Sequence, residues 1–218
     1  MNANKKHAGT QIVAIDGPAG AGKSSISRRV ARELGFAFLD TGAMYRAATW
    51  RALYHQVPLD DPKALAASTL EMALEFRTGP DGIQVLVDGR DVSREIRSPE
   101  VTRHIHLLDQ IPEVRERLVE LQRQFGCQKP TVAEGRDIGT VVFPEARCKI
   151  YLDASLDCRA ERRAAELEAQ GIAVDRAEVR REIAERDAKN MNRAVSPLRR
   201  AEDALLVDTT AMTPDAVT

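Results

Sequence analysis

The sequence predicts an α/β protein with a central parallel sheet of about five strands flanked by helices. Two observations favour this fold. Short apolar runs alternate along the chain with segments in which apolar residues recur at helical spacing, a pattern typical of strand–helix–strand units. The first apolar run is also joined to its helix by a glycine-rich turn. In open α/β sheets, ligands collect at this carboxyl end of the strands.

The first strand is expected over residues 12–15, and Ile26, Val30 and Leu34 mark the helix that follows. The turn between them is Gly17-Pro18-Ala19-Gly20-Ala21-Gly22-Lys23-Ser24, which fits the phosphate-binding pattern G-x-x-x-x-G-K-[ST] without a mismatch. In this context backbone N–H groups turn toward phosphate oxygens, and the helix points the positive end of its dipole at them. We expect Lys23 to reach the β- and γ-phosphates of a nucleotide and the Ser24 hydroxyl to bind Mg²⁺. The alternative is a glycine-rich turn with a stray lysine.

Residues 36–39 predict a second buried strand, which leads through Asp40 into a helix. Arg46 heads a face of this helix that is otherwise apolar. It lies near the positive end of the helix dipole, where a cation is unfavourable unless an anion is close. An ion pair with Asp40 and a bound anionic ligand are the two explanations.

The composition of the sequence changes after residue 57, where prolines and aspartates become frequent. A helix through Leu65 and Leu70 precedes a segment, 76–89, with proline, Asp-Gly and alternating apolar residues, which predicts a small antiparallel hairpin. We expect an inserted lobe over residues 58–100. Two helices follow, and Val114 and Leu118 mark the apolar face of the second.

Residues 131–133, 149–153 and 204–208 predict the remaining strands of the sheet. The first of them runs into Glu134, Arg136 and Asp137, which stand around glycines. Because ligands collect at the carboxyl ends of such strands, we expect these charges near the phosphates. A salt-bridged turn is the alternative.

The most basic part of the chain lies between the last two strands. One helix carries Arg159, Arg162 and Arg163 on a single face, a break follows at 170–173, and a second helix is expected over 175–193. The stripe of this second helix is apolar at first and then polar, with Val179, Ile183, Arg186, Asn190 and Arg193. A core stripe that turns to arginine indicates an anionic ligand. For the three arginines of the first helix, neighbouring glutamates are an equally good explanation.

Composition excludes several classes of protein. The chain has 218 residues, 43% of them hydrophobic, which is enough for one domain with insertions or for a large and a small lobe. A net charge of −1 argues against nucleic-acid and anionic-membrane partners. With no apolar run of membrane-spanning length and a polar segment at 1–10, we expect a cytoplasmic protein. Cys127, Cys148 and Cys158 are odd in number and far apart, so we expect small buried hydrophobic residues rather than disulfides or metal ligands.

These features together favour phosphoryl transfer. The reaction needs a cradle for the donor phosphates, a metal ion and cations around the moving group. Arginine binds phosphate oxygens bidentately, and arginines in three separate segments indicate a second phosphate-bearing molecule. A nucleotide-dependent switch or a nucleic-acid-associated ATPase would need only one nucleotide, and the chain contains no N-K-x-D guanine-binding motif.

The chain resembles the bacterial cytidylate kinases, within the P-loop nucleoside monophosphate kinases. Seven collinear segments carry the resemblance: IDGPAGAGKS (15–24), DTGAMYR (40–46), DGRDVSREIR (88–97), PEVRERL (112–118), EGRDIGTVVFP (134–144), KIYLDAS (149–155) and ERD…NRAVSPL (185–198). It implies a P-loop three-layer core over 1–57, 101–158 and 176–218, an inserted monophosphate-binding lobe over 58–100 with a small antiparallel sheet, and a short helical lid over 159–175. It also implies a monomer that transfers the γ-phosphoryl group of ATP to CMP or dCMP with Mg²⁺. A kinase of UMP or AMP is the nearest alternative.

The resemblance also implies roles for individual residues. ATP-binding residues are Gly17, Pro18, Ala19, Gly20, Ala21, Gly22, Lys23, Ser24, Ser25, Arg159 and Arg163, with Ser24 as the metal ligand. Acceptor-binding residues are Thr41, Arg46, Arg115, Arg136, Asp137, Arg186, Asn190 and Arg193. Lys23, Arg136, Arg186 and Arg193 form the catalytic set.

The sequence departs from the family pattern at three points. Asn190 stands where an aspartate usually binds the sugar hydroxyls, which leaves the preference between ribo- and deoxyribonucleotides open. His106 stands at a position near the base that is commonly serine, which bears on the discrimination between cytosine and uracil. His104 and His106 lack the third ligand that a metal clip would need. Relatives also usually continue beyond the position of Thr218 into a closing helix, so we expect a cost in stability.

Overall fold

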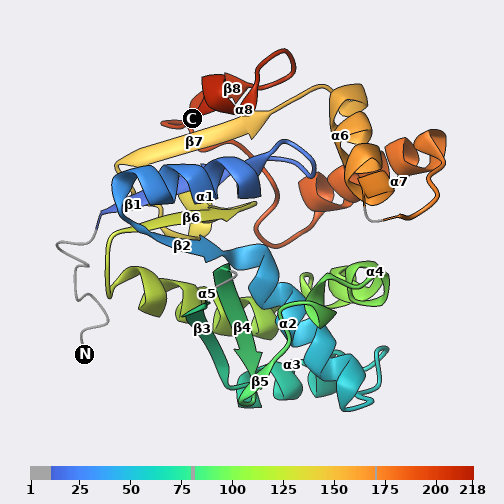
Figure 1. Ribbon diagram of the computed structural model, residues 1–218. Helices are drawn as coiled ribbons and strands as arrows, with labels where there is room; N and C mark the ends of the chain where they lie inside the picture. Colours follow the sequence, from blue (N-terminus) through green and yellow to red (C-terminus); the bar gives the residue numbers. More distant parts are fainter. Residues whose placement is uncertain (1–10, 80–81, 170) are drawn as a thin grey trace. The chain divides into compact units, whose positions relative to one another are not determined.

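The structure is a computed structural model that describes residues 11–79, 82–169 and 171–218 (Figure 1). The chain divides into two compact units. One contains the chain up to Leu39 together with Arg123–Thr218, and the other is Asp40–Gln122. The predicted polar segment 1–10, residues 80–81 of the predicted hairpin turn and position 170 of the predicted helix break lie outside the described residues. The predicted boundaries of the inserted lobe (58–100) and of the lid (159–175) stay predictions.

The first unit is built on a five-stranded sheet with the strand order β2-β6-β1-β7-β8. The strands are β1 (Ile12–Asp16), β2 (Ala37–Asp40), β6 (Thr131–Gly135), β7 (Cys148–Asp153) and β8 (Leu205–Asp208). β1 runs parallel to both β6 and β7, and β7 runs parallel to β8. The predicted α/β fold with a parallel sheet of about five strands is confirmed.

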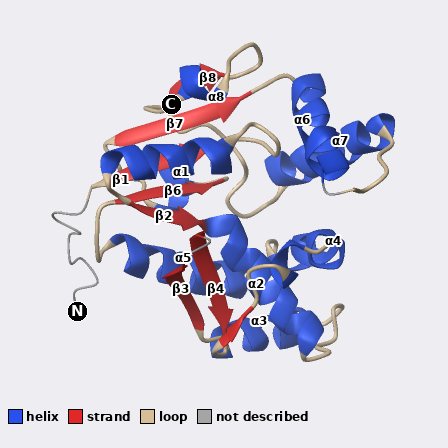
Figure 2. Cartoon of the chain, in the orientation of Figure 1, coloured by secondary structure: helices blue, strands red, loops and turns tan. Residues whose placement is uncertain are grey.

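The middle of this sheet explains why β1 appears in the sequence as an unbroken apolar run. Residues 13–16 of β1 are all buried, as expected for a strand with neighbours on both sides and helices over its faces. Helix α1 (Lys23–Leu34) packs along β1 and β6, and Figure 2 shows helices against the strands of the sheet. The register pairs Asp16 with Gly135 and with Tyr151. The segments that follow β1, β6 and β7 therefore begin at the same edge of the sheet.

Two helices follow β7 and pack against each other: α6 (Leu156–Ala169) and α7 (Arg176–Asn192). Their contact is a small apolar core of Ala160, Val179 and Ile183. Asp175 caps α7, because its carboxylate accepts the N–H groups of Ala177 (2.9 Å) and Glu178 (3.3 Å). The first unit also contains the π-helical turn η2 (Ile138–Val142) and the helix α8 (Pro214–Val217).

The second unit contains the other sheet, a three-stranded antiparallel one in the order β3-β4-β5. Its elements are α2 (Thr41–Tyr54), α3 (Pro62–Glu71), β3 (Leu74–Gly79), β4 (Gly82–Val87), β5 (Arg90–Asp91), η1 (Glu95–Arg97), α4 (Pro99–Leu108) and α5 (Pro112–Gly126), whose last residues belong to the first unit. The predicted small antiparallel sheet is confirmed.

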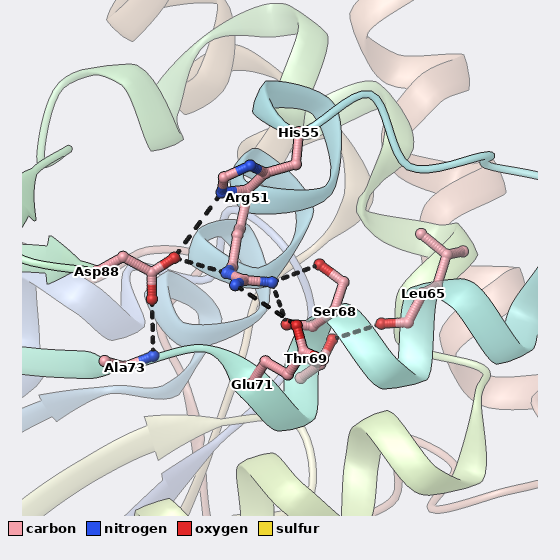
Figure 3. Close-up of polar contacts among 8 residues, drawn as sticks. All are labelled: Arg51, His55, Leu65, Ser68, Thr69, Glu71, Ala73 and Asp88. Atoms are coloured by element: carbon pink, nitrogen blue, oxygen red, sulfur yellow. Dashed lines mark hydrogen bonds and ion pairs between the residues drawn. The ribbon is translucent and has the colours of Figure 1, made fainter.

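A polar network around Arg51, which we call the Arg51 network, joins α2, α3 and the β4–β5 turn (Figure 3). Arg51 Nε donates to Asp88 Oδ2 (2.6 Å), and Arg51 Nη1 donates to the carbonyl oxygen of Ser68 (2.6 Å). Asp88 Oδ1 in turn accepts the backbone N–H of Ala73 (2.9 Å). Burial acts to raise the pKa of Asp88, but the hydrogen bonds from Arg51 and Ala73 outweigh it and hold the pKa below its ordinary value.

The cysteines correct one expectation. Cys127 and Cys148 are exposed and Cys158 is half-buried, so the prediction of small buried hydrophobic residues is wrong. The physical reason is their position at the ends of elements. Cys127 directly follows α5, Cys148 is the first residue of β7, and Cys158 lies in the first turn of α6. Among the described residues, no helix combines the length and the apolar character needed to cross a membrane.

Candidate active site

The glycine-rich turn, 17–24, lies between β1 and α1, as the sequence predicts for a P-loop. Gly17 has a φ of +148°, and a Cβ added to it would lie 2.0 Å from the carbonyl oxygen of Leu152 in β7. Only glycine permits this approach of the loop to the neighbouring strand. The close packing fixes where the loop leaves the sheet, and α1 then begins at Lys23.

Lys23 is buried inside this turn, with 7% of its surface exposed. Its Nζ donates to the carbonyl oxygen of Pro18 at 2.6 Å. Burial, together with the positive charge of Arg136, lowers the pKa of Lys23 to about 7, against the opposing effect of Glu134. An anionic ligand would stabilise the protonated form of this buried lysine, because it would place a negative charge next to the ammonium group.

Two carboxylates stand beside the P-loop. Ser24 Oγ donates a short hydrogen bond to Glu134 Oε1, while Asp16 accepts the N–H groups of Ile138 and Gly139, each at 2.8 Å. Burial raises the pKa of Asp16 to about 6, although these two hydrogen bonds act to lower it. The cluster at the end of β6 and the P-loop are therefore in direct contact, as the register of the sheet requires.

Two of the predicted site residues, Arg136 and Asp137, directly follow β6, and a third, Arg193 at the end of α7, lies beside Asp137. Arg136 Nη1 donates to the carbonyl oxygen of Gly17 (3.3 Å), so this arginine reaches the P-loop. Arg193 Nη2 lies 3.9 Å from Asp137 Oδ1, and its Nε donates to the carbonyl oxygen of Ser196 (2.5 Å). Both Asp137 and Arg193 are nearly inaccessible to solvent. A salt-bridged turn explains part of this cluster, but not the contact of Arg136 with the phosphate-binding loop.

Helix α7 supplies the other predicted contacts of the first unit. Arg186 is half-buried, and its positive charge is among the causes that lower the pKa of Lys23. Asn190 is buried, and its backbone carbonyl oxygen accepts the N–H of Leu198 (2.9 Å). Lys23, Arg136 and Arg186 therefore concentrate positive charge around one loop, which favours an anionic ligand there.

The three arginines of α6 share a predicted face but have different surroundings. Arg159 is buried and pairs with Asp187 of α7. Arg162 Nη2 donates to the carbonyl oxygen of Thr209 (2.7 Å). Arg163 is exposed and pairs with Glu166 (3.0 Å), one turn along the same helix. A nucleotide contact for Arg159 or Arg163 stays a prediction.

Asp187 is the site residue that the sequence reasoning missed. It is buried, pairs with Arg159 and accepts the backbone N–H of Ala19 in the P-loop (3.3 Å). The spacing carried a signal, because Val179, Ile183 and Asp187 recur every four residues. A carboxylate that continues an apolar helical stripe is buried with a partner.

In the second unit, Asp40 gathers two arginines. Its carboxylate caps α2 by accepting the N–H of Ala43 (2.8 Å), and it pairs with Arg46 (3.0 Å) and Arg97 (3.5 Å). The ion pair with Asp40, one of the two explanations for Arg46, is thus observed. An acceptor-phosphate contact for Arg46 stays a prediction.

The remaining predicted residues of the second unit are Thr41, Arg115 and His106. Thr41 is the buried first residue of α2. Arg115 is 3% exposed and lies over the ring of Tyr45, 5.6 Å from its centroid. His106 Nδ1 contacts the carbonyl oxygen of Arg103 (2.8 Å) within α4. In the described part of the chain, no three His, Cys, Asp or Glu side chains are grouped so that they could hold a metal ion, around His104 and His106 or elsewhere.

Comparisons with known proteins agree with this geometry. A family model described as cytidylate kinase matches residues 13–218. A cytidylate kinase from Rhodococcus opacus (strain B4) is 50% identical over 207 residues, which cover 94% of this chain and 90% of that protein. A bifunctional pantoate ligase/cytidylate kinase from Synechococcus elongatus is 49% identical over 212 residues, which cover 95% of this chain but 40% of that protein. The chain therefore spans less than half the length of such bifunctional relatives. Among solved structures, a gluconokinase from Sinorhizobium meliloti 1021 aligns over 95% of this chain and 87% of its own, with a TM-score of 0.44 and 15% identity, which is too low to carry an argument.

Proposed function

This chain belongs to the cytidylate kinase family, and on that premise we propose that it transfers the γ-phosphoryl group of ATP to CMP or dCMP, giving ADP and CDP or dCDP. The observation that carries the proposal is the buried lysine of the P-loop. Lys23 Nζ donates to the neutral carbonyl oxygen of Pro18, and Arg136 and Arg186 act to lower the pKa of Lys23, although Glu134 and Asp16 act to raise it. Such a cluster is costly until polyphosphate oxygens occupy it.

We assign the donor nucleotide to the P-loop and α6. Residues 17–25 would surround the donor phosphates, and the backbone N–H groups of 20–25 and the Lys23 ammonium would hold the β- and γ-phosphates. Arg163, exposed on α6, would add a contact to ATP. Its pairing with Glu166 costs little to break, because exposed ion pairs contribute about 1 kcal/mol or less.

Mg²⁺ fits the oxygen ligands beside the P-loop. The Ser24 hydroxyl and the Glu134 carboxylate are hard oxygen donors that already contact each other, and Asp16 is a third oxygen donor nearby. Mg²⁺ in phosphoryl-transfer sites is held by few protein ligands, together with water and phosphate oxygens, so the small number of donors is appropriate. When bound, the ion neutralises charge on the nucleotide phosphates.

We assign the acceptor nucleotide to two sets of residues. In the second unit they are Thr41, Arg46 and Arg115, and in the first unit they are Arg136, Asp137, Arg186, Asn190 and Arg193. The arginines suit the acceptor phosphate and the moving phosphoryl group, because each guanidinium can bind two phosphate oxygens. Asp137 and Arg115 would contact the base. Asn190 can hydrogen-bond sugar hydroxyls, but it carries no charge.

The chemical step requires orientation rather than a general base. The acceptor phosphate is already an anion, so its oxygen can attack the γ-phosphorus without losing a proton. Lys23, Arg136, Arg186 and Arg193 would reduce the repulsion between two anions and stabilise the charge of the transition state. We further propose that the protein is a cytoplasmic monomer that acts on small molecules and on neither nucleic acid nor membranes.

The test measures ADP formation from Mg·ATP with CMP, dCMP, UMP and AMP offered separately. We expect high turnover with CMP or dCMP and little with AMP. Equal turnover with UMP and CMP would direct attention to His106, and the ratio of CMP to dCMP turnover would show the effect of Asn190. ATP hydrolysis stimulated by RNA or DNA, but by none of the four monophosphates, would reject the proposal in favour of a nucleic-acid-associated ATPase.

A further inference from the structure

The stability of the fold does not explain the ion pair of Arg159 and Asp187. Both side chains are more than nine-tenths buried, at 9% and 8% exposed. Removing two charges from water costs about as much free energy as their mutual attraction returns. A buried ion pair by itself therefore stabilises a fold only weakly. The helices α6 and α7 that carry the pair already share the apolar core of Ala160, Val179 and Ile183. The pair therefore requires another explanation.

Two further hydrogen bonds of this pair converge on the backbone of one P-loop residue, Ala19. Arg159 Nη1 donates to the carbonyl oxygen of Ala19 (3.0 Å), and Asp187 Oδ1 accepts the N–H of the same residue (3.3 Å). Arg159 Nε is held separately by the carbonyl oxygen of Ala154 (2.9 Å), at the end of β7. Both polar backbone groups of Ala19 are thus bound by the two members of one ion pair.

The next residue of the loop is shaped to allow this contact. Gly20 has a φ of +76°, and a Cβ added to it would lie 3.0 Å from Arg159 Cβ and 3.1 Å from the Arg159 carbonyl oxygen. A side chain at position 20 would force the loop away from α6. Gly20, which occupies a variable position of the phosphate-binding pattern, is therefore favoured here by the approach to Arg159 as well as by its left-handed backbone.

Helix α7 and its C-cap residue carry two proposed catalytic arginines, one on each side of Asp187 in the sequence. Arg186 is the preceding residue, and Arg193 lies at the end of the same helix beside Asp137. We propose that Asp187 is a positioning residue which, together with Arg159 of α6, clamps the backbone of Ala19 and so fixes the donor phosphate loop relative to Arg186 of α7 and Arg193 at its end. The inference rests on the proposed function, and it gives Arg159 a positioning role in addition to any contact with ATP.

The clamp is tested by steady-state kinetics of Asp187→Ala, Asp187→Asn and Arg159→Lys, with ATP and CMP varied separately. Asp187→Ala should lower kcat about 10- to 100-fold, because small displacements of catalytic groups have effects of this size. The KM for CMP should stay within about threefold, since Asp187 contacts no acceptor-binding residue in the described contacts. Asp187→Asn keeps an oxygen for the Ala19 N–H and should recover part of kcat. Arg159→Lys keeps the charge but loses the planar fork, so it should lower kcat as well.

Asp157→Ala is the matched control. Asp157 pairs with Arg180 (2.6 Å) and so also joins α6 to α7, but both side chains are exposed and no P-loop contact of theirs is recorded. This variant should keep the kcat of the unmodified protein. If it lowers kcat as much as Asp187→Ala, the pairing of the two helices is what matters and the clamp is rejected.

The outcomes separate the clamp from a purely structural role. Melting temperature and circular dichroism establish that each variant is folded. A lower melting temperature for Asp187→Ala and Asp187→Asn with unchanged kcat, or no change in either quantity, would overturn the inference. If the unmodified protein phosphorylates none of the monophosphates, the proposed function itself fails, and that result appears before any variant is measured.

Discussion

Lys23 of the P-loop and Arg51 of the Arg51 network are both largely shielded from water, but their hydrogen-bond partners differ. Lys23 in the P-loop donates to the neutral carbonyl oxygen of Pro18, and burial lowers its pKa to about 7. Arg51 donates to the carboxylate of Asp88 and to Ser68, and the pKa of Asp88 lies below its ordinary value despite partial burial. The network stabilises its own charges, whereas the P-loop does not.

This difference separates a binding site from a structural connection. In the Arg51 network the charged form of Asp88 is favoured by contacts within the fold, so the network contributes to stability. Around the P-loop the pKa values of Lys23 and Asp16 move toward the neutral forms, to about 7 and about 6. Those shifts mean that the folded chain alone disfavours the charges. In the proposed function, the ligand that would restore them is the polyphosphate of ATP with Mg²⁺.

The largest effect is expected from Lys23→Ala, which should lower turnover with ATP and CMP by orders of magnitude. The reason is the loss of the cation that would hold the β- and γ-phosphates. The melting temperature should be unchanged or higher, because a poorly compensated buried charge is removed. Steady-state kinetics and thermal unfolding of the same preparation measure both quantities. An unchanged kcat would refute the role of Lys23.

A smaller effect of the opposite kind is expected from Arg51→Ala. This change removes the hydrogen bonds to Asp88 and Ser68 and should lower the free energy of unfolding by about 1–3 kcal/mol. The kcat measured well below the melting temperature should change little, because Arg51 belongs to none of the proposed binding sets. Urea unfolding of the variant, with Arg51→Lys as the conservative control, measures the effect. A large fall in kcat at unchanged stability would show that the network serves the reaction and would remove the contrast with the P-loop.

The smallest structural effect is expected from Arg163→Ala. Arg163 is exposed and pairs with Glu166 within one helix, so the free energy of unfolding should change by about 0.5 kcal/mol or less. If Arg163 contacts ATP as proposed, the KM for ATP should rise severalfold while the KM for CMP is unchanged. Glu166→Ala breaks the same ion pair and is the matched control. A rise in the KM for ATP in both variants, or in neither, would contradict the assignment.

The sequence predicted the sheet and the P-loop well, because both depend on local patterns. The apolar run of β1, the glycine spacing and the helical spacing after Lys23 are contained within some twenty-five residues. Parallel pairing then brings the ends of neighbouring strands to one edge, so the contact of Arg136 with the P-loop followed from the order of the elements. The predicted antiparallel sheet of the second unit rested on a similarly local turn signal.

The sequence could not specify the partners of buried charges. Arg159 and Asp187 are 28 positions apart, and Arg51 and Asp88 are 37 apart. Helical periodicity gives the face on which a residue lies, but not the side chain that meets it from another element. For the same reason the three arginines of α6 looked equivalent, although only Arg159 is buried against the P-loop. The prediction that the cysteines are buried was wrong, because the average burial of cysteine in proteins says little about a cysteine at the end of a helix or strand.

The most direct test of the contrast is the proton uptake that accompanies binding of Mg·ATP. With a pKa of about 7, Lys23 is mostly neutral at pH 8 and mostly protonated at pH 6 before the nucleotide binds. Polyphosphate raises the pKa, so binding at pH 8 should take up close to one proton, and affinity should fall as the pH rises above 7. Calorimetry in buffers of different ionisation enthalpy measures the uptake. We expect a large uptake at pH 8, less at pH 6, and none at pH 8 for Lys23→Met at saturating nucleotide. No uptake by the unmodified protein at pH 8, or the same uptake by Lys23→Met, would contradict the account, because it would show that Lys23 does not become protonated when the nucleotide phosphates bind.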